Sequence, residues 1–262
     1  MLDITEIEKE FPKNLRIFKR NMMREYLQYK ILDLIFSSPE GKKLRFIGGT
    51  ALRIVHGLNR FSEDLDFDTT GITFEEFKHL SSTIQHHLKN EGYEVDISFS
   101  GKTAFRCNIR IPDLLYQQGL SPHQHEKILI QLDTEDQHFE FVPDQVFINK
   151  FDVFRPILVT PIDILLSQKL VTAFSRKRPK GRDFYDILFL AGKTTPNYKF
   201  LAQKKKSTHA DELHTYIQTE GKHVDFNQLV EDLTPFVFNP SDAKRIVSFL
   251  DYMKTLPLTP PV

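Results

Sequence analysis

The sequence has little of three things: cysteine, excess charge of either sign, and long apolar runs. Cys107 is the single cysteine, so an internal disulfide is excluded and the cytosol is the default compartment. It lies among alternating apolar residues, which indicates a buried filler rather than a reactive thiol. No run of about 18 apolar residues without charge occurs, so we expect no membrane span. The acidic N-terminus also lacks the basic-then-apolar order of a signal peptide.

The charge is balanced. Lys and Arg number 35, Asp and Glu also number 35, and the formal net charge is zero. No global field therefore draws the protein onto nucleic acid, and any such contact must come from a local basic patch. This argues against a DNA-binding protein, and no helix with clustered base-reading residues supports one. Internal repeats, a Walker loop, a Cys/His metal cluster and a Gly-x-Ser-x-Gly motif do not occur in the sequence.

What is present is an ordinary globular composition. The 262 residues are 40% apolar and 27% charged, which allows one large domain or two small ones. Apolar spacing predicts a long amphipathic helix over 14–36, and the capping-box pair Thr73 and Glu76 predicts the start of another. Alternation typical of strands recurs in three stretches, of which we expect the first two to pair through Gly101-Lys102: 93–100, 103–111 and 127–134.

The most informative stretch is residues 44–68. An apolar run over 44–47 predicts a short strand, which stops at Gly48 and Gly49. Thr50 is then placed to cap a helix that ends at Gly57. The bare backbone N–H groups of the two glycines, with a helix N-terminus behind them, are suited to phosphate oxygens.

A second strand follows this helix, and in it acids alternate with apolar residues. Asp64 and Asp66 are two positions apart, so their side chains share one face, with Cα atoms about 6–7 Å apart. Two carboxylates on one face can hold a hard divalent cation, which prefers oxygen ligands. A phosphate cradle together with a metal pair is the outline of a nucleotidyl-transfer site.

Two blocks of this sequence resemble a known family. The runs Gly48-Gly-Thr-Ala-Leu52 and Arg60-Phe-Ser-Glu-Asp-Leu-Asp-Phe67 resemble the signature of the AbiEii/AbiGii toxins, nucleotidyltransferases of the polymerase-beta-like superfamily. Lys169, followed by Arg182-Asp-Phe-Tyr-Asp-Ile187, resembles the family's later motifs. The resemblance covers about residues 44–190. It implies an α+β fold, in which a polymerase-beta-like nucleotidyltransferase domain with a mixed sheet flanked by helices carries a helical C-terminal subdomain.

In this superfamily a third carboxylate, on a strand beside the Asp-x-Asp strand, acts as base on the attacking hydroxyl. The predicted strand 127–134 turns Gln131, Asp133 and Glu135 to its polar face. The resemblance makes Asp133 the candidate. A different register would place Gln131 there and leave no acid, and a solvated aspartate at the strand end is the structural alternative.

The second block carries the other candidates. The resemblance implies that the Lys169 ammonium neutralises the triphosphate, and that Asp183 and Asp186 orient the lysine and arginine of the site rather than bind metal. The structural alternatives are a solvated lysine and, for Asp183, interaction with the helix dipole. Between the motifs, residues 176–182 contain five cations in seven positions, ending at Arg182. This loop is either solvated, a phosphate-binding edge of the site, or an RNA contact.

We divide the chain into a nucleotidyltransferase core with its N-terminal helix, residues 1–155, and a helical C-terminal subdomain, residues 156–262. The subdomain is expected to complete the cleft and to select the acceptor. Its helical patterns occur in three stretches after a polar, turn-rich region: 210–219, 226–233 and 241–254.

The resulting hypothesis is a metal-dependent enzyme that moves a nucleotidyl group from an NTP onto a hydroxyl of RNA or protein. The predicted ligands of Mg²⁺ (or Mn²⁺) are Asp64, Asp66 and Asp133, and the phosphate contacts are Gly48, Gly49 and the hydroxyl of Thr50 or Ser62. The resemblance implies a toxin or phage-defence component, with the tRNA 3′ end as one acceptor and a separately encoded antitoxin as partner. The alternative is a catalytically inactive nucleotide-binding scaffold on the same fold, which acts through protein contacts.

Overall fold

The computed structural model describes residues 2–101 and 104–259, and it divides into two compact units. Unit 1 extends to Gly57 and from Phe61 to Thr160, whereas unit 2 consists of Leu58–Arg60 and the chain from Pro161 onward. The division thus falls after Thr160 rather than after residue 155, because the last strand of the sheet continues to Val159. Residues 58–60, which we had placed in the first domain, pack with the second.

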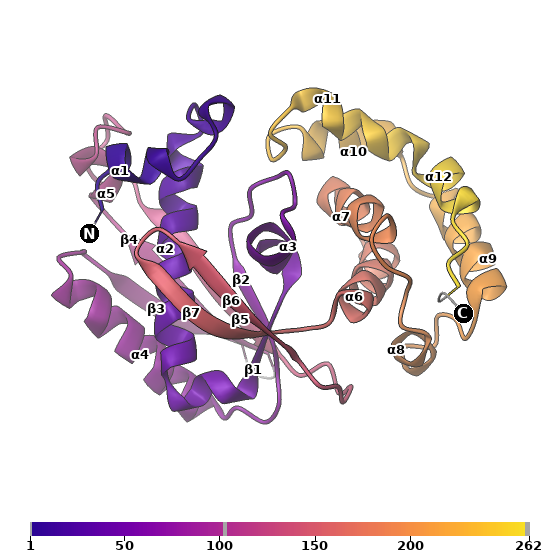
Figure 1. The fold of residues 1–262 in the computed structure, drawn as a ribbon, viewed down its shortest axis with the longest axis horizontal. Helices are drawn as coiled ribbons and strands as arrows, with labels where there is room; N and C mark the ends of the chain where they lie inside the picture. Colours follow the sequence, from indigo (N-terminus) through magenta and orange to yellow (C-terminus); the bar gives the residue numbers. More distant parts are fainter. Residues whose placement is uncertain (1, 102–103, 260–262) are drawn as a thin grey trace. The chain divides into compact units, whose positions relative to one another are not determined.

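In the described part of the chain, unit 1 forms a seven-stranded mixed sheet in the order β3-β4-β5-β2-β1-β7-β6 (Figure 1). Its strands are β1 (Leu44–Ile47), β2 (Leu65–Thr69), β3 (Asp96–Ser100), β4 (Phe105–Ile111), β5 (Ile128–Glu135), β6 (Asp144–Lys150) and β7 (Val153–Val159). Its α-helices are α1 (Ile4–Lys9), α2 (Lys19–Ser37), α3 (Gly48–His56), α4 (Phe74–Asn90) and α5 (Leu114–Gln117). Strand β2 lies at the centre, antiparallel to β1 and parallel to β5.

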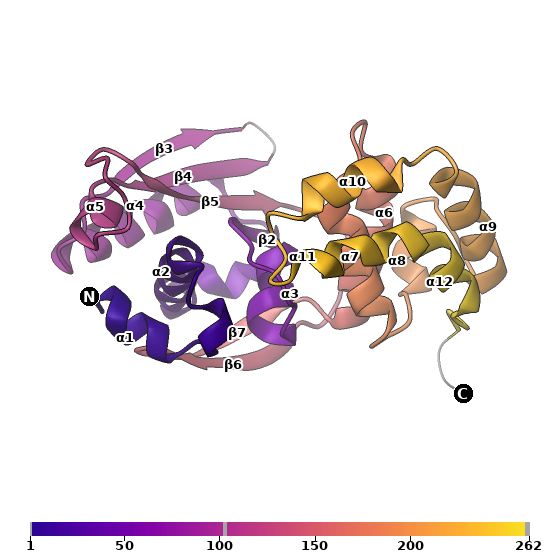
Figure 2. The same ribbon diagram turned by 90° about the horizontal axis from the view of Figure 1, so that it is seen from above.

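The sheet curves around α2. Figure 2 shows β3, β4 and β5 on one side of this helix and β6 and β7 on the other. Helices α2 and α4 cover the same face, where the ring of Phe67 on β2 contacts Phe36 of α2 at 6.3 Å between centroids. Cys107 on β4 is fully buried, as predicted, and burial raises the pKa of its thiol to about 11. Because strand side chains alternate, the polar residues of β2, β4 and β5 face away from this core.

Most element predictions agree with the structure, with corrections at the ends. The capping box of Thr73 and Glu76 does start α4, and β3 and β4 pair as predicted. Lys102, in the predicted turn between them, lies outside the described residues. The predicted helix 14–36 is shorter at its start, where 3₁₀ helix η1 (Lys13–Leu15) precedes α2; a second 3₁₀ helix, η2 (Pro39–Lys43), leads into β1.

Unit 2 is helical in its described residues. It contains α6 (Ile162–Ser175), α7 (Gly181–Ala191), α8 (Tyr198–Gln203), α9 (Ala210–Gly221), α10 (Phe226–Leu233), α11 (Pro240–Ala243), 3₁₀ helix η3 (Lys244–Ser248) and α12 (Phe249–Thr255). Helix α8 was missed, because its short sequence lies in the polar region that we read as turns. The core gathers around Phe184, whose ring lies 5.0 Å from that of Phe249 and 5.1 Å from that of Phe226.

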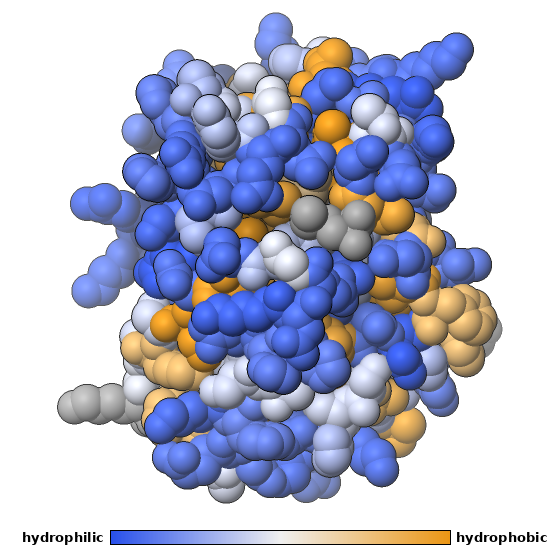
Figure 3. All heavy atoms as spheres, turned by 90° about the vertical axis from the view of Figure 1, so that its left-hand side faces the viewer, coloured by the Kyte–Doolittle hydropathy of each residue, from blue (hydrophilic) through white to orange (hydrophobic). Residues whose placement is uncertain are grey.

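The surface of unit 1 is unremarkable on the side that carries the N-terminus. Figure 3 shows this side to be mainly hydrophilic, with apolar side chains scattered over it rather than gathered in one large patch. Single exposed apolar side chains of this kind are normal on folded domains. Among the described residues, no helix is both long and apolar enough to cross a bilayer.

Candidate active site

The glycine turn after β1 lies against the carboxylate of Asp66 on β2. Gly48 has a φ of 78°, and a Cβ atom built on it would collide with the carboxylate of Asp66. The register explains this closeness, since Ile47 pairs with Asp66 across the antiparallel β1–β2 ladder. Glycine is required at this position for two reasons: it adopts the left-handed backbone without strain, and it leaves the space that the carboxylate fills.

The structure corrects the role of Thr50 as the helix cap. Helix α3 begins at Gly48 with Ile47 as its N-cap, so Thr50 lies inside the first turn. Its side chain is fully buried, and its hydroxyl donates a hydrogen bond to the backbone carbonyl of Asp64. The predicted end of the helix is correct, since Gly57 follows it with a φ of 75°. The hydroxyl of Thr50 thus fixes the main chain at the first acid of the Asp-x-Asp pair.

A second buried side chain holds the same loop. The amide of Gln28, on α2, donates to the backbone carbonyls of Ser62 and Glu63, each at 3.0 Å. Gln28 is 1% exposed, so these bonds are shielded from water. This role of Gln28 could not be predicted from the sequence, because its partners lie more than thirty residues away in the chain. The loop that leads into β2 is therefore fixed from α2 as well as from α3.

The strand register brings the third acid beside the pair. In the parallel ladder of β2 and β5, Asp66 lies opposite Asp133, and Leu65 opposite Leu132. Gln131 instead donates a hydrogen bond to Asn108 on β4, with 2.8 Å between the amide nitrogen and oxygen. Of the two registers considered from the sequence, the structure has the one that places an acid next to Asp66. Asp64, Asp66 and Asp133 are each half-buried.

Arg106, on β4, is a charged member of this group that the sequence did not reveal. Its guanidinium makes a bidentate ion pair with Asp133, with both nitrogen–oxygen distances 2.7 Å. The hydrogen bond and charge of Asp133 raise the pKa of Arg106, and the charges of Asp64 and Asp66 raise it further. Three acids and one arginine therefore share this face of the sheet. The only advance signal was the alternation of β4, which gives Arg106 and Asn108 one face and Cys107 the other.

The donor set is suited to magnesium in one particular way. Among the described residues, no three acidic, histidine or cysteine side chains form a closed metal cage. Magnesium usually needs no such cage, since one or two carboxylates bind it together with substrate phosphates and water. Asp64 and Asp66 provide two carboxylates, and the glycine turn against Asp66 provides backbone N–H groups for phosphate. Asp133 is held by Arg106, so its predicted metal contact requires that ion pair to open.

In unit 2, the candidates of the second block meet in one buried charge cluster. The Lys169 ammonium lies 3.0 Å from an oxygen of Asp183 and 2.8 Å from one of Asp186. The Nε and Nη2 atoms of Arg60 also donate hydrogen bonds to Asp186, at 2.8 and 2.7 Å. Asp186 is fully buried and Arg60 is 2% exposed. The sequence placed Arg60 in a family motif but did not predict this partner.

The charges in the cluster stabilise one another. Burial would raise the pKa of Asp186, but the cations Arg60 and Lys169 outweigh it and hold the pKa below its ordinary value. Burial would likewise lower the pKa of Lys169, yet Asp186 and Asp183 raise it. Each group is therefore ionised at neutral pH.

The basic loop adds a third cation to this cluster. Arg176 approaches the second oxygen of Asp183 at 3.3 Å while its side chain remains 47% exposed. Arg176 therefore adds positive charge at the exposed edge of the cluster. The guanidinium of Arg182, at the end of the same loop, lies 4.1 Å from the ring centre of Phe236. At the end of the loop, Gly181 packs so closely on α10 that a Cβ would collide with the carbonyl of Leu229.

Comparison with solved structures defines the class of fold. A candidate nucleotidyltransferase from Helicobacter pylori is 21% identical, covers 90% of this chain and 96% of its own, and superposes with a TM-score of 0.58. JHP933 from Helicobacter pylori is 20% identical, covers 90% and 93%, and has a TM-score of 0.55. At these identities the likeness shows the fold, and it confirms the predicted nucleotidyltransferase architecture. No curated protein matches the sequence significantly.

The family follows from the sequence match. The model of the nucleotidyl transferase AbiEii toxins, of type IV toxin–antitoxin systems, matches residues 30–261. The chain belongs to this family and is an enzyme of the nucleotidyltransferase class. The match confirms the resemblance drawn from the two motif blocks and extends it through the C-terminal helices.

Proposed function

We propose that this protein is the toxin of a toxin–antitoxin pair and transfers a nucleotidyl group from an NTP to a hydroxyl of RNA, with a divalent cation. The observation that carries the proposal is the register of β2 and β5, which aligns Asp66 with Asp133 and leaves Asp64 on the same face. The glycine turn against Asp66 supplies the adjoining phosphate contact. The tRNA 3′ end is the acceptor that we place first.

In this proposal Asp64 and Asp66 hold Mg²⁺ (or Mn²⁺), and the backbone of Gly48 and Gly49 holds phosphate oxygens. When bound, the cation neutralises charge on the phosphates and polarises the phosphorus–oxygen bonds. Thr50 has a positioning role, because its hydroxyl is engaged with the backbone at Asp64. The predicted contact of the Ser62 hydroxyl with phosphate stays part of the proposal.

The chemical step is a displacement at the α-phosphorus of the NTP. The acceptor hydroxyl oxygen bonds to that phosphorus, the bond to the oxygen bridging to the β-phosphate breaks, and pyrophosphate leaves. The hydroxyl proton passes to the carboxylate of Asp133, which must be ionised to accept it. Its ion pair with Arg106 holds the carboxylate in place. Arg106 is thus a positioning residue for the base.

We assign the counter-charge for phosphate in unit 2 to Lys169 and to Arg176, whose side chain remains 47% exposed. Asp183 and Asp186 orient Lys169, as the family resemblance implies, and Arg182 remains a candidate phosphate contact. The exposed cations of the loop 176–182 form the local basic patch that RNA binding requires in a chain of zero net charge.

One observation favours a second candidate function. Asp133 is occupied by Arg106, and no closed metal cage exists among the described residues. A catalytically inactive scaffold that binds a nucleotide and acts through protein contacts would tolerate both features. Labelling of RNA by an α-labelled NTP distinguishes the enzyme from the scaffold.

The test is incubation of the purified protein with each α-labelled NTP and Mg²⁺, together with total RNA or total protein. We expect label in RNA with the wild type, and a loss of several orders of magnitude in Asp66→Asn, which keeps the shape and removes the charge. Asp68→Asn is the matched control, because this buried carboxylate lies two positions further on the same strand and binds the backbone N–H of Gln137.

Each other result has a definite meaning. Label in protein rather than RNA would move the acceptor to a protein hydroxyl. Label that persists undiminished in Asp66→Asn would remove the metal role of this carboxylate. No label with any NTP would favour the scaffold. Co-expression with the neighbouring gene product then tests for the antitoxin, which should abolish the labelling.

A further inference from the structure

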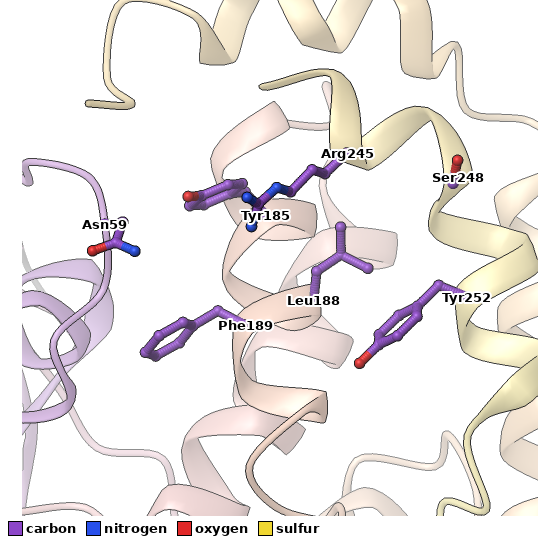
Figure 4. A pocket seen from close by; sticks show the side chains of 7 residues that line it. All are labelled: Asn59, Tyr185, Leu188, Phe189, Arg245, Ser248 and Tyr252. Atoms are coloured by element: carbon purple, nitrogen blue, oxygen red, sulfur yellow. The ribbon is translucent and has the colours of Figure 1, made fainter. Parts of the chain in front are cut away.

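Unit 2 contains a pocket that the proposed chemistry does not use. It is about 440 Å³ in volume and is lined in part by residues of α7. Tyr185, Leu188 and Phe189 come from α7 at the spacing that places them on one helical face. Three further lining residues come from other segments: Tyr252 of α12, Arg245 of η3 and Asn59 of the segment 58–60 (Figure 4). We call this the α7 pocket.

The size and character of the α7 pocket fit a small organic ligand. Ligand sites in proteins have volumes of about 300–1,000 Å³, with mostly apolar and aromatic walls and a few convergent polar groups. Three aromatic rings contribute here, and Figure 4 shows Phe189 and Tyr252 reaching from α7 and α12. The phenol of Tyr185 is buried, and burial raises its pKa, so this ring is a neutral surface at physiological pH. Aromatic walls of this kind favour a flat ring system.

The charged groups around the pocket favour an anion beside that ring system. Arg245 makes a single ion pair with Asp242 at 2.7 Å, and its side chain is 67% exposed. A guanidinium has five N–H donors, so one carboxylate oxygen leaves most of them available for a phosphate. Lys193 places a second cation 4.6 Å from the ring centre of Phe189.

Asn59 supplies a hydrogen-bonding group to the α7 pocket. It is exposed, and Figure 4 shows its amide on the loop that faces Phe189. The loop is fixed in unit 2, because the N–H of Phe238 donates to the carbonyl of Asn59 at 3.4 Å and Arg60 is held by Asp186. A carboxamide has two donors and an acceptor, which suit the hydrogen-bonding edge of a nucleobase.

We infer that the α7 pocket binds one ribonucleotide unit, with its base against the aromatic side chains that line the pocket, its edge at Asn59 and its phosphate at Arg245. The inference rests on the proposed function, because an RNA acceptor would deliver such a unit as an unpaired nucleotide. A free nucleotide has the same chemistry, and the experiment distinguishes the two sources. Stacking on aromatic side chains is how proteins commonly hold unpaired bases.

The absence of tryptophan from the sequence gives a clean assay. Phe189→Trp introduces a single tryptophan whose fluorescence a stacked base will quench. We expect quenching by ribonucleoside monophosphates and by a single-stranded 12-nucleotide RNA, and none by ribose 5-phosphate, which has no base. Phe154→Trp, at a ring that is 66% exposed on β7, is the matched reporter for non-specific quenching.

Variants and a second measurement keep the inference falsifiable. Tyr252→Leu in the reporter chain should weaken binding by about 5- to 150-fold, the range for loss of one base-stacking contact. Arg245→Gln, at an exposed position, should reduce the thermal stabilisation that the same RNA gives the unsubstituted protein. At least tenfold tighter binding of the RNA than of the monophosphates identifies a strand as the source, whereas equal affinities identify a free nucleotide. Equal quenching of both reporters, or binding unchanged by both variants, would overturn the inference.

The outcome is separable from that of the labelling test. The fluorescence titration is repeated in Asp66→Asn, which we expect to leave the affinity unchanged. Quenching without any labelling of RNA would leave the pocket in place and remove the proposed function. Labelling without quenching would retain the function and remove the pocket.

Discussion

The buried charge cluster of unit 2 allows a quantitative prediction for the substitution Asp186→Asn. The change keeps the side-chain shape and removes the charge that two cations share. Arg60 would keep its charge, because a guanidinium does not deprotonate in proteins, and it is 2% exposed. Removing one partner of a buried ion pair costs about 3–5 kcal/mol, since the other charge is left buried without its compensating charge.

This cost is a large share of a total stability of about 5–15 kcal/mol. At a urea slope of about 2 kcal/mol per molar, it lowers the midpoint of unfolding by roughly 1.5–2.5 M. The two units need not unfold together, so a global signal is not sufficient. Urea-dependent hydrogen exchange, followed by mass spectrometry on peptides of α6 and α7, measures unit 2 directly.

Two further variants decide what the result means. Asp251→Asn removes a carboxylate that is 85% exposed and 3.4 Å from Lys254, and we expect it to cost less than about 1 kcal/mol. Adding Arg60→Met to Asp186→Leu should restore much of the stability, because an apolar pair of similar volume can replace a buried ion pair. If Asp186→Asn cost no more than the exposed control, water would be screening the cluster and the reasoning would be refuted.

The same cluster predicts a pH dependence with a definite sign. The folded-state pKa of Asp186 is lowered, so its stabilisation is complete above the unfolded value of about 3.9 and is lost as pH falls through the lower folded value. The stability difference between wild type and Asp186→Asn should therefore be constant near neutral pH and shrink below about pH 4. A difference that grew on acidification would contradict this assignment.

Two more predictions concern the acids of unit 1. Gly48→Ala should abolish RNA labelling, because its Cβ displaces the carboxylate of Asp66 and its φ is strained. The helical signal in circular dichroism, to which α2 and α4 contribute, should be unchanged. Full activity would exclude the close packing of Gly48 against Asp66. Arg106→Gln should strengthen Mn²⁺ binding by up to about fivefold in calorimetry, the range for release of one exposed ion pair from Asp133. Arg110→Gln, on the same face of β4, is its control, and equal effects would mean only a general change of charge.

Local chemistry explains which elements could be predicted from the sequence. The capping box of Thr73, the left-handed Gly57 and the alternation around Leu132 each depend on neighbouring residues, and each agrees with the structure. Thr50 was a good cap by residue type, yet the N-cap is Ile47, three residues earlier, and the side chain of Thr50 is buried in the first turn. A cap preference of about 1 kcal/mol is readily outweighed by the packing that buries this side chain.

The partners in the site could not be predicted in this way. Arg106 meets Asp133 through strand pairing 27 residues apart, and Arg60 meets Asp186 across 126 residues. No spacing in the sequence encodes such a contact, because tertiary packing sets it. The family motifs named Arg60 and Asp186 as important without saying that they bind each other, and they gave no indication of Arg106 or Gln28.

Burial and partners finally separate acids that look alike in the sequence. Asp186 is fully buried between two cations, where a substrate cannot reach it, and its charge maintains the fold of unit 2. Asp64 and Asp66 are half-buried at a glycine turn whose missing side chain makes room for a carboxylate. A group must be accessible to act on a substrate, so our proposal assigns chemistry to the Asp-x-Asp pair and positioning to the Arg-Asp-x-x-Asp motif. Asp133 lies between these cases. Whether Arg106 releases it determines whether Asp133 can bind a cation in addition to the one that we assign to Asp64 and Asp66.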